Sequence, residues 1–105
     1  MAIVDSSGLD NLNKTTSELS KEISRKIIFS IISKAKSGVE ISNDTKLSQS
    51  TVYQKISILK DLSLVQINHK ETTERGRTIE FFKSNISKAI IIIDKEQPKL
   101  VLVKN

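Results

Sequence analysis

Apolar residues recur at helical spacing in the first third of the chain. The side chains that repeat every four residues are Leu19, Ile23, Ile27, Ile31 and Ala35. This period predicts one helix that begins at Thr15, which has capping-box spacing with Glu18, and that closes at Gly38 as its C-cap residue. Ile28, Ile32 and Phe29 widen the apolar stripe, so it serves either the core or a subunit contact.

Two shorter helices are predicted next. Residues 39–45 form the first, with Val39 and Ile41 pointing inward, and residues 46–47 form a turn. The second covers about 48–62. Its inward face, at spacings of four, three and three, consists of Val52, Ile56, Leu59 and Leu62.

The pattern then changes to the two-residue alternation of strands. Residues 65–70 and 79–82 alternate on either side of the polar segment 71–78, which predicts a hairpin with a charged tip. Residues 89–93 and 100–103 flank turn-forming residues and predict a second hairpin. Both of its strands are apolar on both faces, so one face packs on the helices while the other meets a second chain or the first helix.

These elements describe an α+β chain of 105 residues, with room for one core. We expect a flexible leader in residues 1–14, a folded body in residues 15–83, and a C-terminal extension in residues 84–105 that packs on the body or forms a dimer contact.

The residue types argue against chemistry at a metal or catalytic centre. The chain has no cysteine and a single histidine, His69, which is a poor metal ligand by itself and is expected to be a partly buried strand residue. No Ser/His/acid grouping or phosphate-binding loop is present, so we expect no enzyme activity and no cofactor. The chain also lacks a secretory signal and an apolar segment of membrane-spanning length, which favours a cytoplasmic protein without a membrane partner.

The charge is unevenly distributed along the chain. The net charge is +5; residues 1–22 contribute −2, so residues 23–105 carry +7. A basic folded body favours a polyanionic partner.

Short polar side chains crowd the beginning of the helix at 48–62. The segment starts at Ser48 or Gln49, where a hydroxyl can cap free backbone N–H groups. A helix that enters the DNA major groove by its N-terminal turn needs such short donors and acceptors for base edges, while its N–H groups and positive dipole end meet phosphates. Glutamine pairs with adenine through two hydrogen bonds, so Gln49, Ser50 and Gln54 are the candidates for reading bases, and Tyr53 and Lys55 are candidate phosphate contacts.

The order helix, short helix, turn, helix and charged hairpin resembles the winged helix-turn-helix of small prokaryotic transcriptional regulators of the ArsR-like and MarR-like kind. The resemblance is carried by EISNDTKLSQSTVYQKISILKDLSLVQI and covers about residues 15–83. It departs from the family pattern at Lys46 and Ser63, which stand where the family usually has glycine, at positions that often need a positive φ. The C-terminal hairpin lies outside the resemblance.

The resemblance implies a homodimer that binds duplex DNA, with the helix at about 48–62 in the major groove and a wing at 71–78 on the backbone or the minor groove. Arg75 and Arg77 flank Gly76 at the wing tip, where glycine allows a tight turn. Glu71, Glu74 and Glu80 dilute the potential of the two arginines. The complete set of predicted DNA-binding residues is Ser48, Gln49, Ser50, Thr51, Tyr53, Gln54, Lys55, Lys60, Arg75 and Arg77.

Two simpler interpretations stay open. The polar beginning of the helix at 48–62 is also what a well-capped, solvated helix would have. In the second alternative, the winged helix is a protein-interaction module of a transcription-related assembly, and the apolar C-terminal hairpin is its docking strand.

Overall fold

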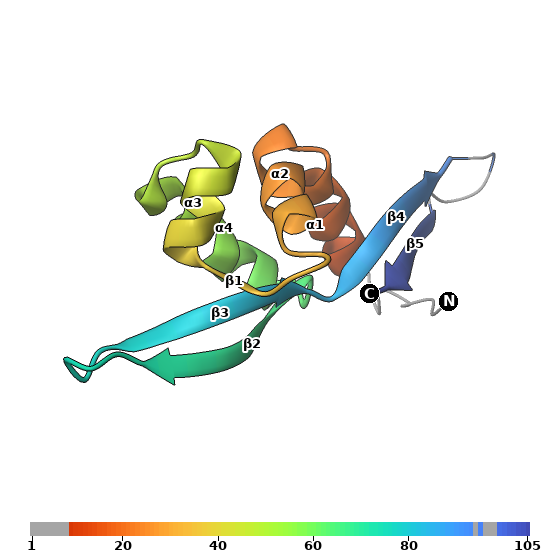
Figure 1. Cartoon of the computed structure of the whole chain (residues 1–105). Coiled ribbons are helices and arrows are strands. Elements are labelled where there is room, and N and C mark those ends of the chain that lie inside the picture. Colours follow the sequence, from red (N-terminus) through yellow and green to blue (C-terminus); the bar gives the residue numbers. More distant parts are fainter. Residues whose placement is uncertain (1–8, 94, 96–98) are drawn as a thin grey trace.

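The helices lie over a three-stranded sheet (Figure 1). A second sheet, of two strands, extends from the end of the molecule opposite to the tip of the first sheet. The computed structural model describes residues 9–93, 95 and 99–105, with side chains from Leu12 onward. The molecule is elongated, with extents of 57 × 24 × 22 Å, because the two hairpins point in different directions. The predicted α+β class is confirmed.

The single helix predicted from Thr15 to Gly38 is wrong, because the chain breaks after Leu19. Helix α1 (Leu9–Leu19) and helix α2 (Glu22–Ser30) are separated by Ser20 and Lys21. Lys21 has extended backbone angles, and the Ser20 hydroxyl donates to the carbonyls of Thr16 and Ser17 at 2.8 and 2.9 Å. Serine hydroxyls that bond to a preceding turn compete with the helix ladder. The apolar stripe is thereby divided, and Ile23 is exposed.

Gly38 begins a helix instead of ending one. After α2 the chain forms the short strand β1 (Lys36–Ser37) and then helix α3 (Gly38–Thr45). Ser37 and Glu40 form a capping box: the Ser37 hydroxyl accepts from the Glu40 N–H at 3.2 Å, and the Ser37 N–H donates to the Glu40 carboxylate at 3.1 Å. In α3, Ile41 is fully buried as predicted, whereas Val39 is 45% exposed, so its inward orientation was wrong.

Helix α4 (Gln49–Asp61) occupies the predicted position, and Ser48 is its N-cap residue. The inward face is confirmed, with Val52, Ile56 and Leu59 buried and Leu62 packed against the core. Lys46 and Ser63 at the two ends have φ values of 64° and 61°. Both non-glycine residues therefore adopt the left-handed conformation that the family pattern implied.

The first predicted hairpin is present and longer than expected. Strand β2 (Val65–Thr72) and strand β3 (Thr78–Ser84) pair antiparallel, and β1 pairs along the other side of β3. The register shifts between Ile67 and His69, which places Asn68 in a bulge. His69 stacks on Phe81 with ring centroids 4.6 Å apart and is exposed, not partly buried as expected.

The second predicted hairpin is also present, with strand β4 (Ile86–Ile92) paired antiparallel to strand β5 (Lys99–Lys104). Its predicted turn falls largely on residues 94 and 96–98, which lie outside the described part of the chain. Ile86 and Leu102 are buried and join the core of the helical body. Ile90 and Ile92, on the opposite face of the hairpin, stay exposed.

The core is aliphatic and lies between the helices and the inner ends of the strands. Its fully buried large side chains are Ile27, Ile28, Ile31, Ile41, Val52, Leu59 and Leu64. Of the predicted leader, residues 9–14 belong to α1, and residues 1–8 lie outside the described residues. No helix in the described part has the length and apolar character needed to cross a membrane.

Candidate nucleic-acid interface

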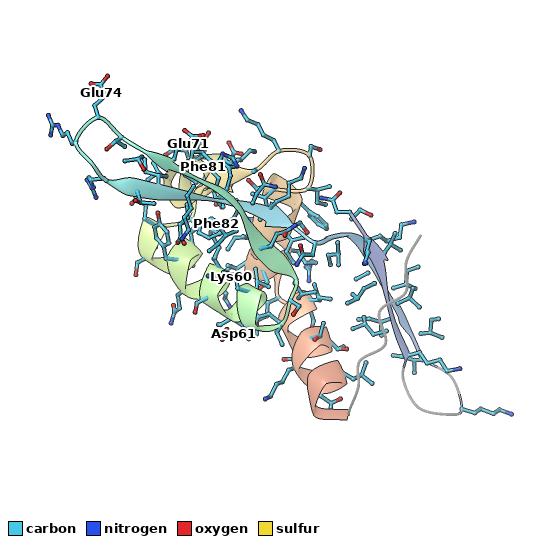
Figure 2. All side chains as sticks on the ribbon, turned by 90° about the horizontal axis from the view of Figure 1, so that it is seen from below. Lys60, Asp61, Glu71, Glu74, Phe81 and Phe82 are labelled. Atoms are coloured by element: carbon cyan, nitrogen blue, oxygen red, sulfur yellow. The ribbon has the colours of Figure 1, made fainter. Side chains whose placement is uncertain are left out.

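The beginning of α4 and the tip of the β2–β3 hairpin lie at the same end of the molecule (Figures 1 and 2). The α4 side chains Gln49, Ser50 and Gln54 are exposed, as is Ser57 one turn further on. Among the described residues, no hydrogen bond uses the side chains of Gln49, Ser50 or Gln54. Their donors and acceptors are therefore open to an external partner.

Ser48 and Thr51 have a different role from their neighbours. The Ser48 hydroxyl accepts from the Thr51 N–H at 3.1 Å and donates to the Thr51 hydroxyl at 2.9 Å. The two side chains thus provide hydrogen-bond partners for each other and for a free backbone N–H group at the start of α4. The simpler interpretation, a capped helix, thus accounts for Ser48 and Thr51 but leaves Gln49, Ser50 and Gln54 unexplained.

Tyr53 lies across the start of α3. A Cβ atom on residue 38 would overlap the end of the Tyr53 ring, so only glycine at position 38 allows the ring to lie there. The ring is 48% exposed, and it connects the surface of α4 to that of α3. The sequence singled out Gly38 for a helix end and missed this close approach.

The hairpin tip is a defined turn. The Gly76 N–H donates to the Thr73 carbonyl at 2.9 Å, and the Thr73 N–H donates to the Arg77 carbonyl at 2.8 Å. Gly76 has a φ of 81°, with open space around it, which confirms the prediction that glycine allows the turn. Arg75 and Arg77 flank it and are exposed.

Acidic side chains offset the charge of this tip. Residues 71–78 contain two glutamates and two arginines, so the tip has no net charge. Figure 2 shows Glu74 at the end of the turn. Further back, Lys70 pairs with Glu80 at 3.9 Å. A polyanion that approaches the two arginines also meets Glu74, which weakens its attraction.

Lys55 points into the protein. Its ammonium lies 2.9 Å from the carboxylate of Glu18 in α1, and its side chain is only 17% exposed. Glu18, itself 5% exposed, also accepts hydrogen bonds from Ser24 and, at 3.3 Å, from Lys21. The Lys55 ammonium is therefore directed to Glu18 and away from the exposed face of α4, although its position on the helix suggested a phosphate contact.

This cluster explains the ionisation of Glu18. Burial by itself raises the pKa of the Glu18 carboxyl, but the hydrogen bonds from Ser24, Lys55 and Lys21 outweigh burial, and the pKa lies below its ordinary value of 4.5. Glu18 is thus a carboxylate at neutral pH. It connects α1, α2 and α4 through charged hydrogen bonds, a role that sequence spacing did not reveal.

Lys60 is exposed but stands apart from the other predicted residues. It lies in the last turn of α4 beside Asp61 (Figure 2), about 16 Å along the helix from Gln49 at 1.5 Å per residue. The structure therefore groups the α4 beginning with the hairpin tip, and places Lys60 at the other end of the helix.

The chain was compared with models of known protein families and with curated protein sequences, and neither comparison gives a match.

Proposed function

We propose that the protein is a winged helix-turn-helix regulator that binds duplex DNA and controls transcription by occluding promoter DNA. In this proposal α3 and α4 form the helix-turn-helix, α4 enters the major groove, and the β2–β3 hairpin is the wing. The protein acts by binding and not by catalysis.

One observation carries the proposal. The side chains of Gln49, Ser50 and Gln54 are exposed and make no hydrogen bond among the described residues. The beginning of α4 lies at the same end of the molecule as the tip of the β2–β3 hairpin, which carries Arg75 and Arg77. Amide side chains that read bases, beside guanidinium groups that reach the backbone or minor groove, are what such a DNA site requires. Tyr53 and Lys60 add candidate phosphate contacts.

The experiment is a salt titration of binding to a labelled random-sequence duplex, followed by fluorescence anisotropy. Each phosphate contact contributes about 0.9 to the slope of log K against log salt. Replacing Arg75 and Arg77 by alanine should weaken binding to all sequences and lower that slope by roughly two for each protomer bound. A control with the same charge change, Lys14→Ala with Lys26→Ala at two exposed lysines of α1 and α2, should leave the slope unchanged. Equal slopes for the two double variants would contradict the wing assignment.

Base reading is tested separately by a binding selection on random duplexes. Gln54→Ala should relax the preferred base at one position and cost about 1–3 kcal/mol on the preferred sequence, with little loss on random DNA. An equal loss on every sequence would assign Gln54 to the backbone instead.

We propose a homodimer as the DNA-binding form. A wing tip without net charge gives one protomer modest affinity for DNA, and two linked binding sites raise that affinity without new contacts. The exposed isoleucines Ile90 and Ile92 supply an apolar face for self-association. Measurement of the solution mass by sedimentation equilibrium tests this directly, and a monomer at micromolar concentration that still binds DNA tightly would contradict it.

The same exposed face favours a second candidate function, a module that docks to another protein through the β4–β5 hairpin. Salt distinguishes the two functions. Binding to random duplex that weakens steeply with salt supports the DNA regulator, and absence of DNA binding at low ionic strength supports the docking module.

A further inference from the structure

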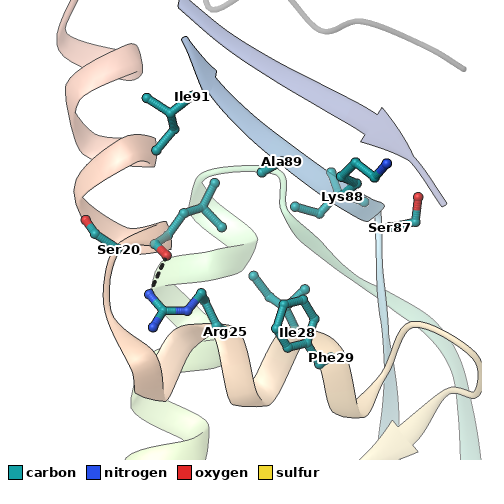
Figure 3. Close-up of a pocket in the computed structure, with 10 residues that line it drawn as sticks. Ser20, Arg25, Ile28, Phe29, Ser87, Lys88, Ala89 and Ile91 are labelled. Carbon is teal, nitrogen blue, oxygen red and sulfur yellow. Dashed lines mark hydrogen bonds between the residues drawn. The ribbon is translucent and has the colours of Figure 1, made fainter. Parts of the chain in front are cut away.

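A cavity of about 320 Å³ lies between the helices and the C-terminal hairpin (Figure 3). The end of α1 and one side of α2 form two walls, and strand β4 forms the third. Its volume falls in the range of small-molecule sites in proteins, about 300–1,000 Å³. The cavity is separate from the surface proposed for DNA.

The walls are mainly apolar. Leu19 and Ile28 come from the helices, and Ala89 and Ile91 come from β4. Phe29 and Ile91 border the cavity and remain 62% and 43% exposed, so apolar surface of the free protein stays in contact with water. An apolar ligand would remove that surface from water, which favours binding at about 25 cal/mol per Å².

The charged groups at the cavity are cationic. Arg25 reaches from α2 toward α1, where its Nη1 donates to the Leu19 carbonyl at 3.1 Å (Figure 3). This bond uses one of the five N–H donors of the guanidinium and fixes its place at the wall. Among the side chains that the structure describes, no carboxylate lines the cavity or pairs with Arg25, and the other charged group at the wall is the lysine Lys88.

We propose that this cavity binds a small monocarboxylate with an apolar chain. The carboxylate accepts hydrogen bonds from Arg25, and the chain lies against Leu19, Ile28 and Ile91. A guanidinium matches a carboxylate in both geometry and charge, and it discriminates against neutral and cationic molecules of the same shape. This binding does not depend on the proposed DNA function.

The test uses three ligands with the same eight-carbon chain: octanoate, octan-1-ol and octyltrimethylammonium, all below their micellar concentrations. Binding to the full chain is followed by NMR of isoleucine methyl groups. Octanoate should shift the methyl signals of Ile28 and Ile91, bind about tenfold more tightly than octanol, and exclude octyltrimethylammonium. Equal affinity for all three ligands, or octanoate shifts confined to other isoleucines, would overturn the proposal.

Two variants make the test specific. Arg25→Gln should weaken octanoate about tenfold and leave octanol unchanged, because only the carboxylate loses its partner. Lys26→Gln is the matched control, since Lys26 is the next residue of α2, is half exposed and pairs with Glu22 at 3.8 Å. Equal losses in the two variants would show a general charge effect and overturn the assignment of Arg25. Far-UV circular dichroism and thermal unfolding establish that both variants are folded before affinities are compared.

Discussion

The cluster around Glu18 leads to the sharpest prediction, the effect of Glu18→Gln on stability. The substitution keeps the size of the side chain and removes its charge. In the folded protein this leaves the Lys55 ammonium beside a neutral amide, in a position where its side chain is only 17% exposed. A buried cation without a counter-charge destabilises the fold.

The expected loss is about 2–4 kcal/mol in the free energy of unfolding. Removing one partner of a buried pair costs roughly 3–5 kcal/mol, and Lys55 can recover part of this by moving toward water. The amide oxygen of the substituted side chain can still accept one hydrogen bond, which also reduces the loss. The figure is large beside the 5–15 kcal/mol of total stability expected for a small domain.

Urea unfolding at pH 7, followed by far-UV circular dichroism, measures the effect. The control is Glu22→Gln, which removes a carboxylate that is 73% exposed and pairs with Lys26 at 3.8 Å. We expect it to change stability by less than about 0.5 kcal/mol. The double variant Glu18→Gln/Lys55→Met should be more stable than Glu18→Gln alone, because the uncompensated ammonium is gone. If Glu18→Gln costs no more than Glu22→Gln, the cluster does not hold the three helices together.

The pH dependence gives an independent test. The pKa of Glu18 is lowered in the folded protein, so its carboxylate stabilises the fold fully above the unfolded value near 4.5, and this contribution is lost as the pH falls through the lower folded pKa. The stability gap between the wild type and Glu18→Gln should therefore be largest at neutral pH and close in acid. A gap that widens on acidification would refute the assignment.

Three further predictions concern the backbone, the wing and the surface of α4. Lys46→Gly should raise the free energy of unfolding by about 0.5–1 kcal/mol in urea, because Lys46 has a φ of 64°. Asn43→Gly inside α3 should lower it by a similar amount. A loss of stability in both variants would exclude strain at Lys46. Glu74→Gln should strengthen DNA binding roughly two- to fivefold at low salt in an anisotropy titration, and Glu22→Gln should not change it. An unchanged affinity for Glu74→Gln would mean that the wing tip stays away from phosphate. Tyr53 is the one tyrosine in a chain without tryptophan, so intrinsic tyrosine emission should change on saturation with duplex DNA, and unchanged emission would place the bound DNA away from α4.

The sequence predicted the elements whose signals are local. The period of α4, the alternation of the first hairpin and the apolar runs of the second depend on neighbouring residues, and these elements were found where expected. Strand β1 was missed because two residues give no periodic signal, and its pairing of Lys36 with Phe82 joins distant segments. The capping box of Ser37 and Glu40 was readable, since Ser-x-x-Glu marks a helix start, and it would have corrected the role of Gly38.

In the candidate interface, too, one part was predictable from nearby residues and another part was not. The exposure of Gln49, Ser50 and Gln54 follows from the positions of the buried residues of α4, because side chains outside the buried face of a helix point toward solvent. The inward position of Lys55 could not be predicted, since its partner Glu18 is 37 residues away in the chain. A lysine at the border of a helix face faces water or a carboxylate according to what packs beside it, and only the tertiary structure decides which.

The break between α1 and α2, which the apolar period concealed, shapes both the Glu18 cluster and the proposed cavity. A continuous helix would carry Ser24 about 1.7 turns beyond Glu18, out of reach of its carboxylate. The break at Ser20 and Lys21 brings the two side chains into hydrogen-bond contact. The carboxylate so placed also holds Lys55 of α4. The next residue, Leu19, forms a wall of the cavity and accepts the bond from Arg25. The end of α1 beside this junction thus supplies both the partner of Lys55 in α4 and a wall of the cavity.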